Sequence, residues 1–183
     1  LPETERWRLE RQAEEAAAEY LDLKQLDSLI TRNDALISEG VQQKINELKK
    51  ACDLWVKERG EQMIVFTEFK DTLDHLLDCM RDWEISPAQI HGGMTLPERR
   101  QAEKLFWEGQ AQVLVATEAA GEGINLQCCH VMINFDLPWN PTRLEQRMGR
   151  IHRYGQKADT VYVFNLLAQN SMEDEVKQAL LDK

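Results

Sequence analysis

Apolar residues change their spacing repeatedly along the chain after Gly60. Short runs rich in β-branched and aromatic residues predict buried strands, and they lie at 63–69, 88–93, 112–117, 131–136 and 160–167. Between them, apolar residues recur three and four positions apart, which predicts helices at 71–83, 95–109, 140–155 and from Ser171 onward. This alternation predicts an α/β fold, a parallel sheet with helices on both faces.

The first 60 residues have a different pattern. An apolar stripe at helical spacing over residues 5–30 predicts one helix, and a second stripe from Val41 to Val56 predicts another that stops at Gly60. We therefore expect a helical N-terminal extension or linker at 1–35, followed by one domain at 36–183. Because the chain starts with Leu1 and is soon helical, we expect it to be a piece of a longer protein.

Two of the predicted helices carry clear start signals. Thr95 and Glu98 have the spacing of a capping box, in which each side chain hydrogen-bonds the other's backbone amide. Asn140 followed by Pro141 is a typical N-cap and first helical residue, and Gly155 is a typical helix end. The second of these helices is therefore expected to cover residues 140–155.

Composition narrows the class of protein. The 183 residues are 43% hydrophobic and 30% charged, and no apolar run approaches the roughly 20 residues that cross a bilayer. The net charge of −10 argues against a nonspecific nucleic-acid coat. The four cysteines have no metal-site spacing, so we expect structural thiols in a reducing cytosol and no metal ligands.

The one basic block is residues 141–157, with five basic residues and one acidic residue. On a helical wheel one face gathers Arg143, Gln146, Arg147, Arg150 and Arg153. A solvated basic face is one interpretation. Binding of phosphate oxygens is the other, because arginine donates two parallel hydrogen bonds to such groups. Gly149 would let a ligand or another chain approach the backbone.

Glycines also follow a predicted strand in "TEAAGEG" at 117–123. Gly121 and Gly123 indicate a tight turn or a phosphate contact, and the spacing alone does not decide between them. The chain contains no G-x-x-x-x-G-K-[ST] phosphate loop. If the ligand is a nucleotide, the chain holds only part of its binding site.

Taken in order, these segments resemble the second RecA-like lobe of superfamily 2 helicases and translocases. "IVFTEF" at 64–69 is similar to motif IV, "VLVATEAAGEGINL" at 113–126 to motif V and "QRMGRIHRYGQ" at 146–156 to motif VI. "FDLPWNP" at 135–141 resembles the SWI/SNF branch, and the wording as a whole is closest to its outlying bacterial members. The resemblance covers about residues 40–183.

The resemblance implies roles for the basic block and the glycines. It implies that Arg150 and Arg153 are the catalytic arginine fingers, which reach the γ-phosphate of ATP across the interface between two lobes. It places Gln146 and Arg147 in the same nucleotide cleft. The motif V residues Gly121, Gly123 and Asn125 would couple the nucleotide to DNA.

The resemblance also implies partners. It places Thr67, Gly93 and Thr117 against the nucleic-acid backbone, with double-stranded DNA as the expected partner. ATP would be the cofactor, with Mg²⁺ held mainly by a first RecA-like lobe that this chain lacks. Glu118 departs from the family, because many relatives have Arg or Asp there.

The sequence therefore predicts the second motor lobe of an ATP-dependent DNA translocase or helicase, cytoplasmic, bacterial and DNA-associated. The fragment alone is expected to be inactive. One alternative is a non-catalytic RecA-like module that binds DNA or protein. An RNA helicase lobe is a further alternative, which the pairing of "DLPWNP" with "HRYGQ" disfavours.

Overall fold

The computed structural model describes residues 38–118, 126–138 and 140–167. The chain divides into two compact units, Leu1–Val41 and Gln42–Lys183, and the fold set out below belongs to the second. The predicted helix at 5–30, the boundary predicted between 35 and 36, and the predicted helix from Ser171 lie outside the described residues.

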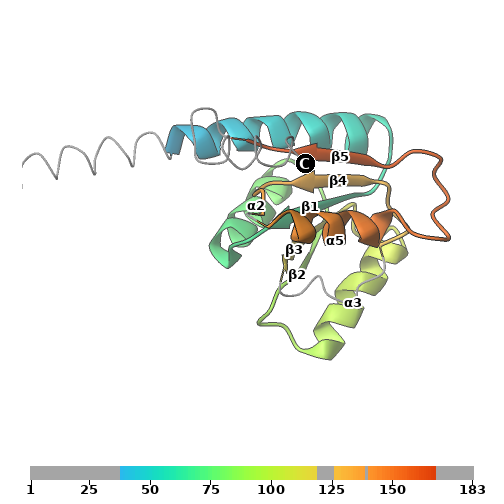
Figure 1. Cartoon of the computed structure of the whole chain (residues 1–183). Helices are drawn as coiled ribbons and strands as arrows, with labels where there is room; N and C mark the ends of the chain where they lie inside the picture. The colour runs from blue at the N-terminus through green and yellow to red at the C-terminus, as the bar shows by residue number, and fades with distance from the viewer. Residues whose placement is uncertain (1–37, 119–125, 139, 168–183) are drawn as a thin grey trace, which may run out of the picture. The chain divides into compact units, whose positions relative to one another are not determined.

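Five parallel strands form the sheet, in the order β2-β3-β1-β4-β5 (Figure 1). Their bounds are β1 (Met63–Thr67), β2 (Pro87–Ile90), β3 (Val113–Thr117), β4 (Val131–Asn134) and β5 (Tyr162–Asn165). Four of the five lie entirely within the runs expected from the sequence, and β2 starts one residue before its run. The predicted parallel α/β fold is therefore confirmed.

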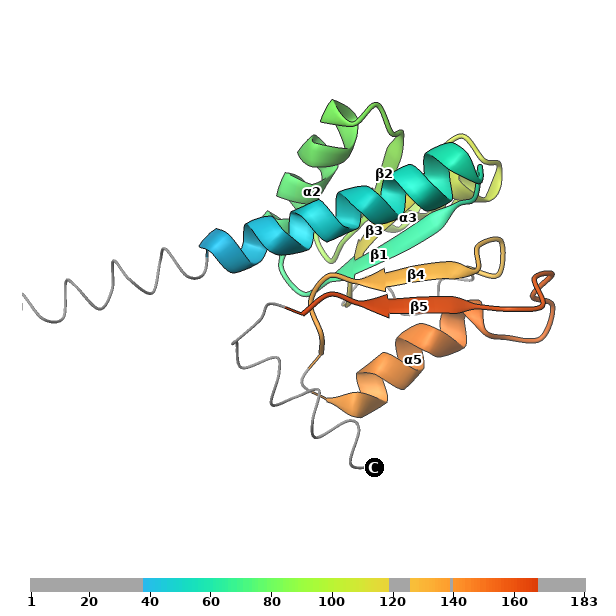
Figure 2. The same ribbon diagram turned by 90° about the horizontal axis from the view of Figure 1, so that it is seen from above.

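Helices cover both faces of the sheet, as Figures 1 and 2 show. Residues 38–52 are α-helical and continue into a π-helical stretch, η1 (Asp53–Glu58), which packs with α2 (Lys70–Asp82) on one face. The other face carries α3 (Leu96–Trp107) and α5 (Pro141–Ile151). This arrangement follows from right-handed connections between parallel strands.

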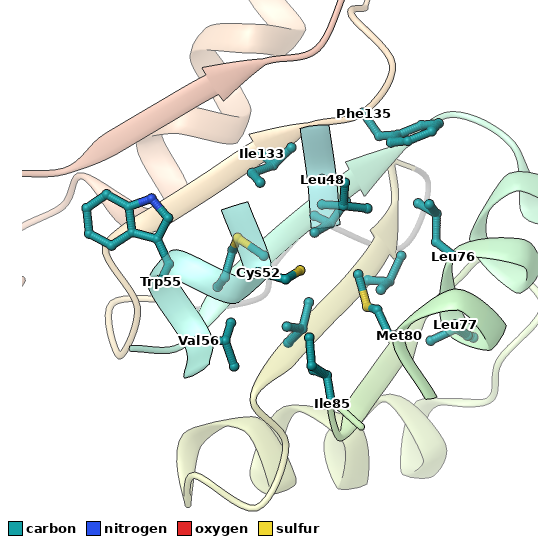
Figure 3. Close-up of a cluster of buried hydrophobic side chains, with 14 of the residues drawn as sticks. Leu48, Cys52, Trp55, Val56, Leu76, Leu77, Met80, Ile85, Ile133 and Phe135 are labelled. Carbon is teal, nitrogen blue, oxygen red and sulfur yellow. The ribbon is translucent and has the colours of Figure 1, made fainter. Parts of the chain in front are cut away.

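The sheet has a hydrophobic core on each face, and successive side chains of the three central strands point alternately into one core and the other. In β1, Met63 and Val65 face the helix formed by residues 42–58 together with α2, whereas Ile64 and Phe66 face α3 and α5. Figure 3 shows the first core, where Leu48 and Cys52 pack beside Ile133 and near Leu76 and Met80 of α2. Because both faces are covered, the central strands are apolar almost throughout.

The capping box predicted at the start of α3 is present. The backbone amide and the hydroxyl of Thr95 both donate to Glu98 Oε2, at 2.7 Å each. These hydrogen bonds from the Thr95 side chain and backbone lower the pKa of the Glu98 carboxyl. The carboxylate therefore occupies the amino end of α3, which fixes the loop between β2 and this helix.

The four cysteines are free thiols. Burial raises the pKa of Cys52 and of Cys129 to about 12, so both stay protonated at neutral pH and pack as small apolar side chains. No helix in the described ranges combines the length and the apolar character needed to cross a membrane.

Candidate functional site

The carboxyl ends of β1, β3 and β4 meet at one edge of the sheet. Thr67 pairs in register with Thr117, and Phe66 pairs with Asn134, so the residues that follow each strand lie close together. Glu68, Glu118 and Asp136 come from these three strand ends. In open α/β sheets this is the edge where ligands bind.

The basic helix α5 runs from Pro141 to Ile151. Its start is as predicted, because Asn140 Oδ1 accepts a hydrogen bond of 3.0 Å from the Thr142 amide, and Pro141 follows. Its end differs from the prediction of a helix to residue 155. His152 leaves the helical region with ψ 81°, so Arg153 lies in the turn beyond the helix, where wheel geometry does not apply.

Arg147 is the largest fully buried side chain of the described residues, with 2% of its surface exposed. Nη1 donates to Asn134 Oδ1 at 2.9 Å and to the Asp136 carbonyl at 3.0 Å, and Nη2 donates to Glu118 Oε2 at 2.8 Å. Its guanidinium carbon lies 5.2 Å from the centre of the Phe66 ring. Arg147 therefore ties α5 to the ends of β1, β3 and β4, instead of facing solvent with the other arginines.

One donor of Arg147 stands apart from this network. Its Nε is buried and has no hydrogen-bond partner among residues 38–118, 126–138 and 140–167. A buried guanidinium is tolerated because the Glu118 carboxylate compensates its charge. The network therefore depends on Glu118, whose side chain is 23% exposed and which also lies 4.0 Å from Arg143 Nη1.

The remaining basic residues of the block lie nearer to solvent. Arg143, Gln146 and Arg153 are exposed, and Arg150 is half-buried. Arg153 forms no ion pair within the part of the chain that the structure describes. The space around the Gly149 backbone is open, so the described residues give no steric reason for glycine there. Close approach of another chain or ligand to Gly149 stays a prediction.

Asp136 organises a second polar group at the same edge. Its Oδ2 accepts from the Thr67 hydroxyl at 2.5 Å and from the Glu68 amide at 3.2 Å. Lys44 lies 3.8 Å from its Oδ1 and donates to the Phe135 carbonyl at 3.0 Å. Burial, with Glu118 and Asp136 nearby, raises the pKa of the Glu68 carboxyl, although Arg147 opposes this shift.

The residues predicted to touch nucleic acid lie at strand ends, as expected, but their exposure differs. Thr67 is fully buried and its hydroxyl is bonded to Asp136, and Thr117 is 6% exposed. Gly93 is exposed in the loop after β2, where its amide donates to His91 Nδ1 at 3.2 Å. In this structure, therefore, only Gly93 of the three is open to a phosphate.

Three predicted site residues, Gly121, Gly123 and Asn125, lie outside the described residues. Over the described ranges, no group of three or more His, Cys, Asp or Glu side chains could hold a metal ion.

A sequence profile decides the family. The profile of the helicase conserved C-terminal domain matches residues 43–155, which is more than half of the chain. The chain is a helicase C-terminal domain. Motifs IV, V and VI of the predicted resemblance therefore meet in this helicase domain at one sheet edge, where Phe66, Glu118 and Arg147 interact.

Two bacterial proteins illustrate what the helicase domain is similar to. It is 44% identical over 128 residues to the uncharacterized ATP-dependent helicase YqhH of Bacillus subtilis, covering 70% of this chain and 23% of that protein. It is 42% identical over 109 residues to the RNA polymerase-associated protein RapA of Vibrio cholerae, covering 57% and 11% respectively. The chain thus spans a minority of the length of these relatives.

A solved structure agrees with the fold. The crystal structure of the C-terminal part of the Fun30 ATPase domain superposes with a TM-score of 0.69 and 28% identity, covering 74% of this chain and 44% of that one. The RecA-like fold and the resemblance to the second lobe of SWI/SNF-like superfamily 2 proteins are confirmed.

Sequence reasoning missed the residues that hold the site of the helicase domain together. Asn134 is the last residue of β4 and ends its apolar run, and its side chain bridges Arg147 and Asn165. A polar side chain in a buried strand needs a hydrogen-bond partner, so Asn134 was the feature of the sequence that could have indicated this network. Lys44 had no comparable signal, because its partners Phe135 and Asp136 lie about 90 residues away in sequence.

Proposed function

We propose that this chain is the second motor lobe of an ATP-dependent translocase or helicase that acts on double-stranded DNA. Arg150 and Arg153 act as arginine fingers, and Gln146 lines the same cleft. The observation that carries the proposal is the exposed guanidinium of Arg153, which follows α5 and the buried anchor Arg147 along the chain.

The chemistry of phosphoryl transfer supports these roles. Negative charge spreads over the transferred group in the transition state, so fixed cations stabilise it. Arg153 suits this task because its guanidinium is exposed and forms no ion pair with any residue in the described ranges. Arg147 has a different role from the predicted contact with the nucleotide. Its charge is already compensated by Glu118, so it holds α5 against the sheet.

The proposal requires a first RecA-like lobe, supplied by the protein that contains this chain. That lobe would hold most of the ATP and the Mg²⁺, while this chain adds positive charge from the opposite side. The exposed guanidinium of Arg153 can donate two parallel hydrogen bonds to phosphate oxygens. A protein of this kind would be cytoplasmic and DNA-associated.

Contacts with the DNA backbone are proposed at the strand ends of this lobe. Gly93 is exposed, and the carbonyls beside it are held by Arg99, which donates to Gly92 at 3.0 Å and to Met94 at 3.2 Å. Thr67 and Thr117 support the shape of this edge, with Gly121, Gly123 and Asn125 proposed as the link to the nucleotide. Such contacts carry no base-sequence information.

The isolated 183-residue chain is expected to show no ATP hydrolysis. It lacks a phosphate-loop lysine, so it cannot hold the triphosphate for the arginines to act on. A coupled ATPase assay with and without DNA checks this, using the full-length protein as the positive control. DNA-stimulated turnover by the chain that disappears in Arg153→Ala would contradict the proposal.

The isolated chain is also expected to bind DNA weakly and in a salt-dependent way. Its net charge is −10 and only a few backbone contacts are proposed, so the dissociation constant should be about 10⁻⁴ M. With two or three phosphate contacts, a plot of log K against log salt should have a slope of about −2 to −3. Titration by fluorescence anisotropy measures both. Tight, salt-insensitive or sequence-specific binding would count against these contacts.

A further inference from the structure

The turn directly after α5 carries Arg153, and exposed residues dominate it. Residues 152–155 are all exposed, and Tyr154 is completely so, which means that no apolar burial fixes this turn. Its backbone is nevertheless held at three points between residues 151 and 154. These are the carbonyls of Ile151, Arg153 and Tyr154, each of which accepts a hydrogen bond.

Gln156 supplies two of these hydrogen bonds. Its backbone amide donates to the Arg153 carbonyl at 3.0 Å, and its side-chain Nε2 donates to the Ile151 carbonyl at 2.9 Å. Ile151 is the last residue of α5, where carbonyls lack a helical partner. The same Nε2 also donates to the Cys129 carbonyl at 2.9 Å, and Oε1 accepts from the Ala158 amide at 3.0 Å. Gln156 therefore joins the end of α5 to the segment before β4.

Gln127 supplies the third hydrogen bond from a different part of the chain. Its Nε2 donates to the Tyr154 carbonyl at 2.7 Å. Gly155 makes room for this side chain, because a Cβ there would lie 3.2 Å from Gln127 Oε1, and its φ of +100° disfavours other residues. Two glutamines from opposite sides thus hold the turn at residues 152–156.

We propose that Gln127 and Gln156, the glutamine clamp, are positioning residues that hold Arg153 in place for catalysis. The inference rests on the proposed function of Arg153. An arginine finger works only where developing charge appears, and a displacement of about 1 Å can cost about 10²-fold in rate. Because the turn is exposed, hydrogen bonds hold its backbone within the described residues, and the two side-chain amides therefore fix the backbone position from which the Arg153 side chain extends.

Replacing the donor amide by a carboxylate tests the clamp with little change of shape. In the full-length protein, Gln156→Glu is expected to lower kcat by about 10²-fold and to leave the dissociation constant of ATP within about threefold. Gln127→Glu removes the hydrogen bond to the Tyr154 carbonyl in an exposed turn, so the variant should fold normally and lower kcat by about tenfold. Gln110→Glu is the matched control, because that exposed amide donates to the Glu108 carboxylate and, among the residues that the structure describes, to no other group, and its kcat should be unchanged.

Hydrogen–deuterium exchange on the same proteins adds a readout that does not depend on turnover. Peptides covering residues 152–158 should exchange about tenfold faster in Gln156→Glu, because the turn is no longer anchored to the Ile151 and Cys129 carbonyls through Nε2. If Arg153→Ala lowers kcat but both clamp variants keep normal kcat or normal hydrogen–deuterium exchange, the proposed role of the clamp is wrong. The proposed function of Arg153 would still stand. Normal turnover in Arg153→Ala would overturn the proposed function, and the catalytic role of the clamp with it.

Discussion

Arg147→Ala should destabilise this domain by about 3–5 kcal/mol, the usual cost of removing one partner from a buried ion pair. The substitution leaves the Glu118 carboxylate without its closest cation and removes donors from Asn134 Oδ1 and the Asp136 carbonyl. It also opens a cavity beneath α5, next to the Phe66 ring. Urea unfolding followed by circular dichroism measures the loss.

Arg143→Ala is the matched control for this prediction. Arg143 lies on the same helix and faces the same carboxylate, but at 4.0 Å and with 55% of its side chain exposed, so its loss should cost at most about 0.5 kcal/mol. Glu118→Gln keeps a hydrogen-bond acceptor but removes the charge, and an intermediate loss of about 1–3 kcal/mol is expected. Equal effects of Arg147→Ala and Arg143→Ala would show that the buried network does not stabilise the domain.

Local patterns sufficed to predict most of the fold. The strands β1, β3 and β4 are buried on both faces, so each is a continuous apolar run bounded by polar residues. The start of α3 was readable because its capping box involves residues only three positions apart. Features set by neighbours in the sequence can be predicted from it, whereas those set by distant residues cannot.

The structure differs from the sequence prediction at two main points of the site, the burial of Arg147 and the end of α5, and both depend on residues distant in sequence. A helical wheel groups Arg147 with the exposed arginines, but Ile151, one turn later, is buried, and the side of the helix that they share packs onto the sheet. The burial of Arg147 is possible only because Glu118 and Asn134 arrive from other strands. Similarly, the turn that follows α5 at Ile151 is held by Gln127 and by the hydrogen bond from Gln156 to the Cys129 carbonyl, distant partners that the helical spacing does not reveal.

Replacing Arg150 and Arg153 together by alanine should lower kcat of ATP hydrolysis by about 10³-fold or more in the full-length protein. Developing charge on the transferred phosphoryl group would lose its fixed cations. Affinity for ATP should fall much less, because the proposed first lobe holds most of the nucleotide. The Arg153→Ala single variant should change the stability of this domain by no more than about 0.5 kcal/mol, since that side chain is exposed.

Two further variants separate this role from a general effect of charge. Arg153→Lys keeps the positive charge but lacks the planar guanidinium fork, so it should not restore turnover. Arg81→Ala removes an exposed arginine from α2, on the opposite face of the sheet, where it pairs only with Asp78 in the part of the chain that the structure describes. That control should retain normal turnover and normal ATP affinity.

The steady-state kcat of the Arg150→Ala/Arg153→Ala protein, measured beside its dissociation constant for ATP, tests most directly whether this lobe contributes to ATP hydrolysis. A fall in kcat of about 10³-fold or more, with ATP binding within about fivefold of the unmodified protein, is the predicted result. Turnover close to that of the unmodified protein would contradict it and would favour a lobe retained for binding alone.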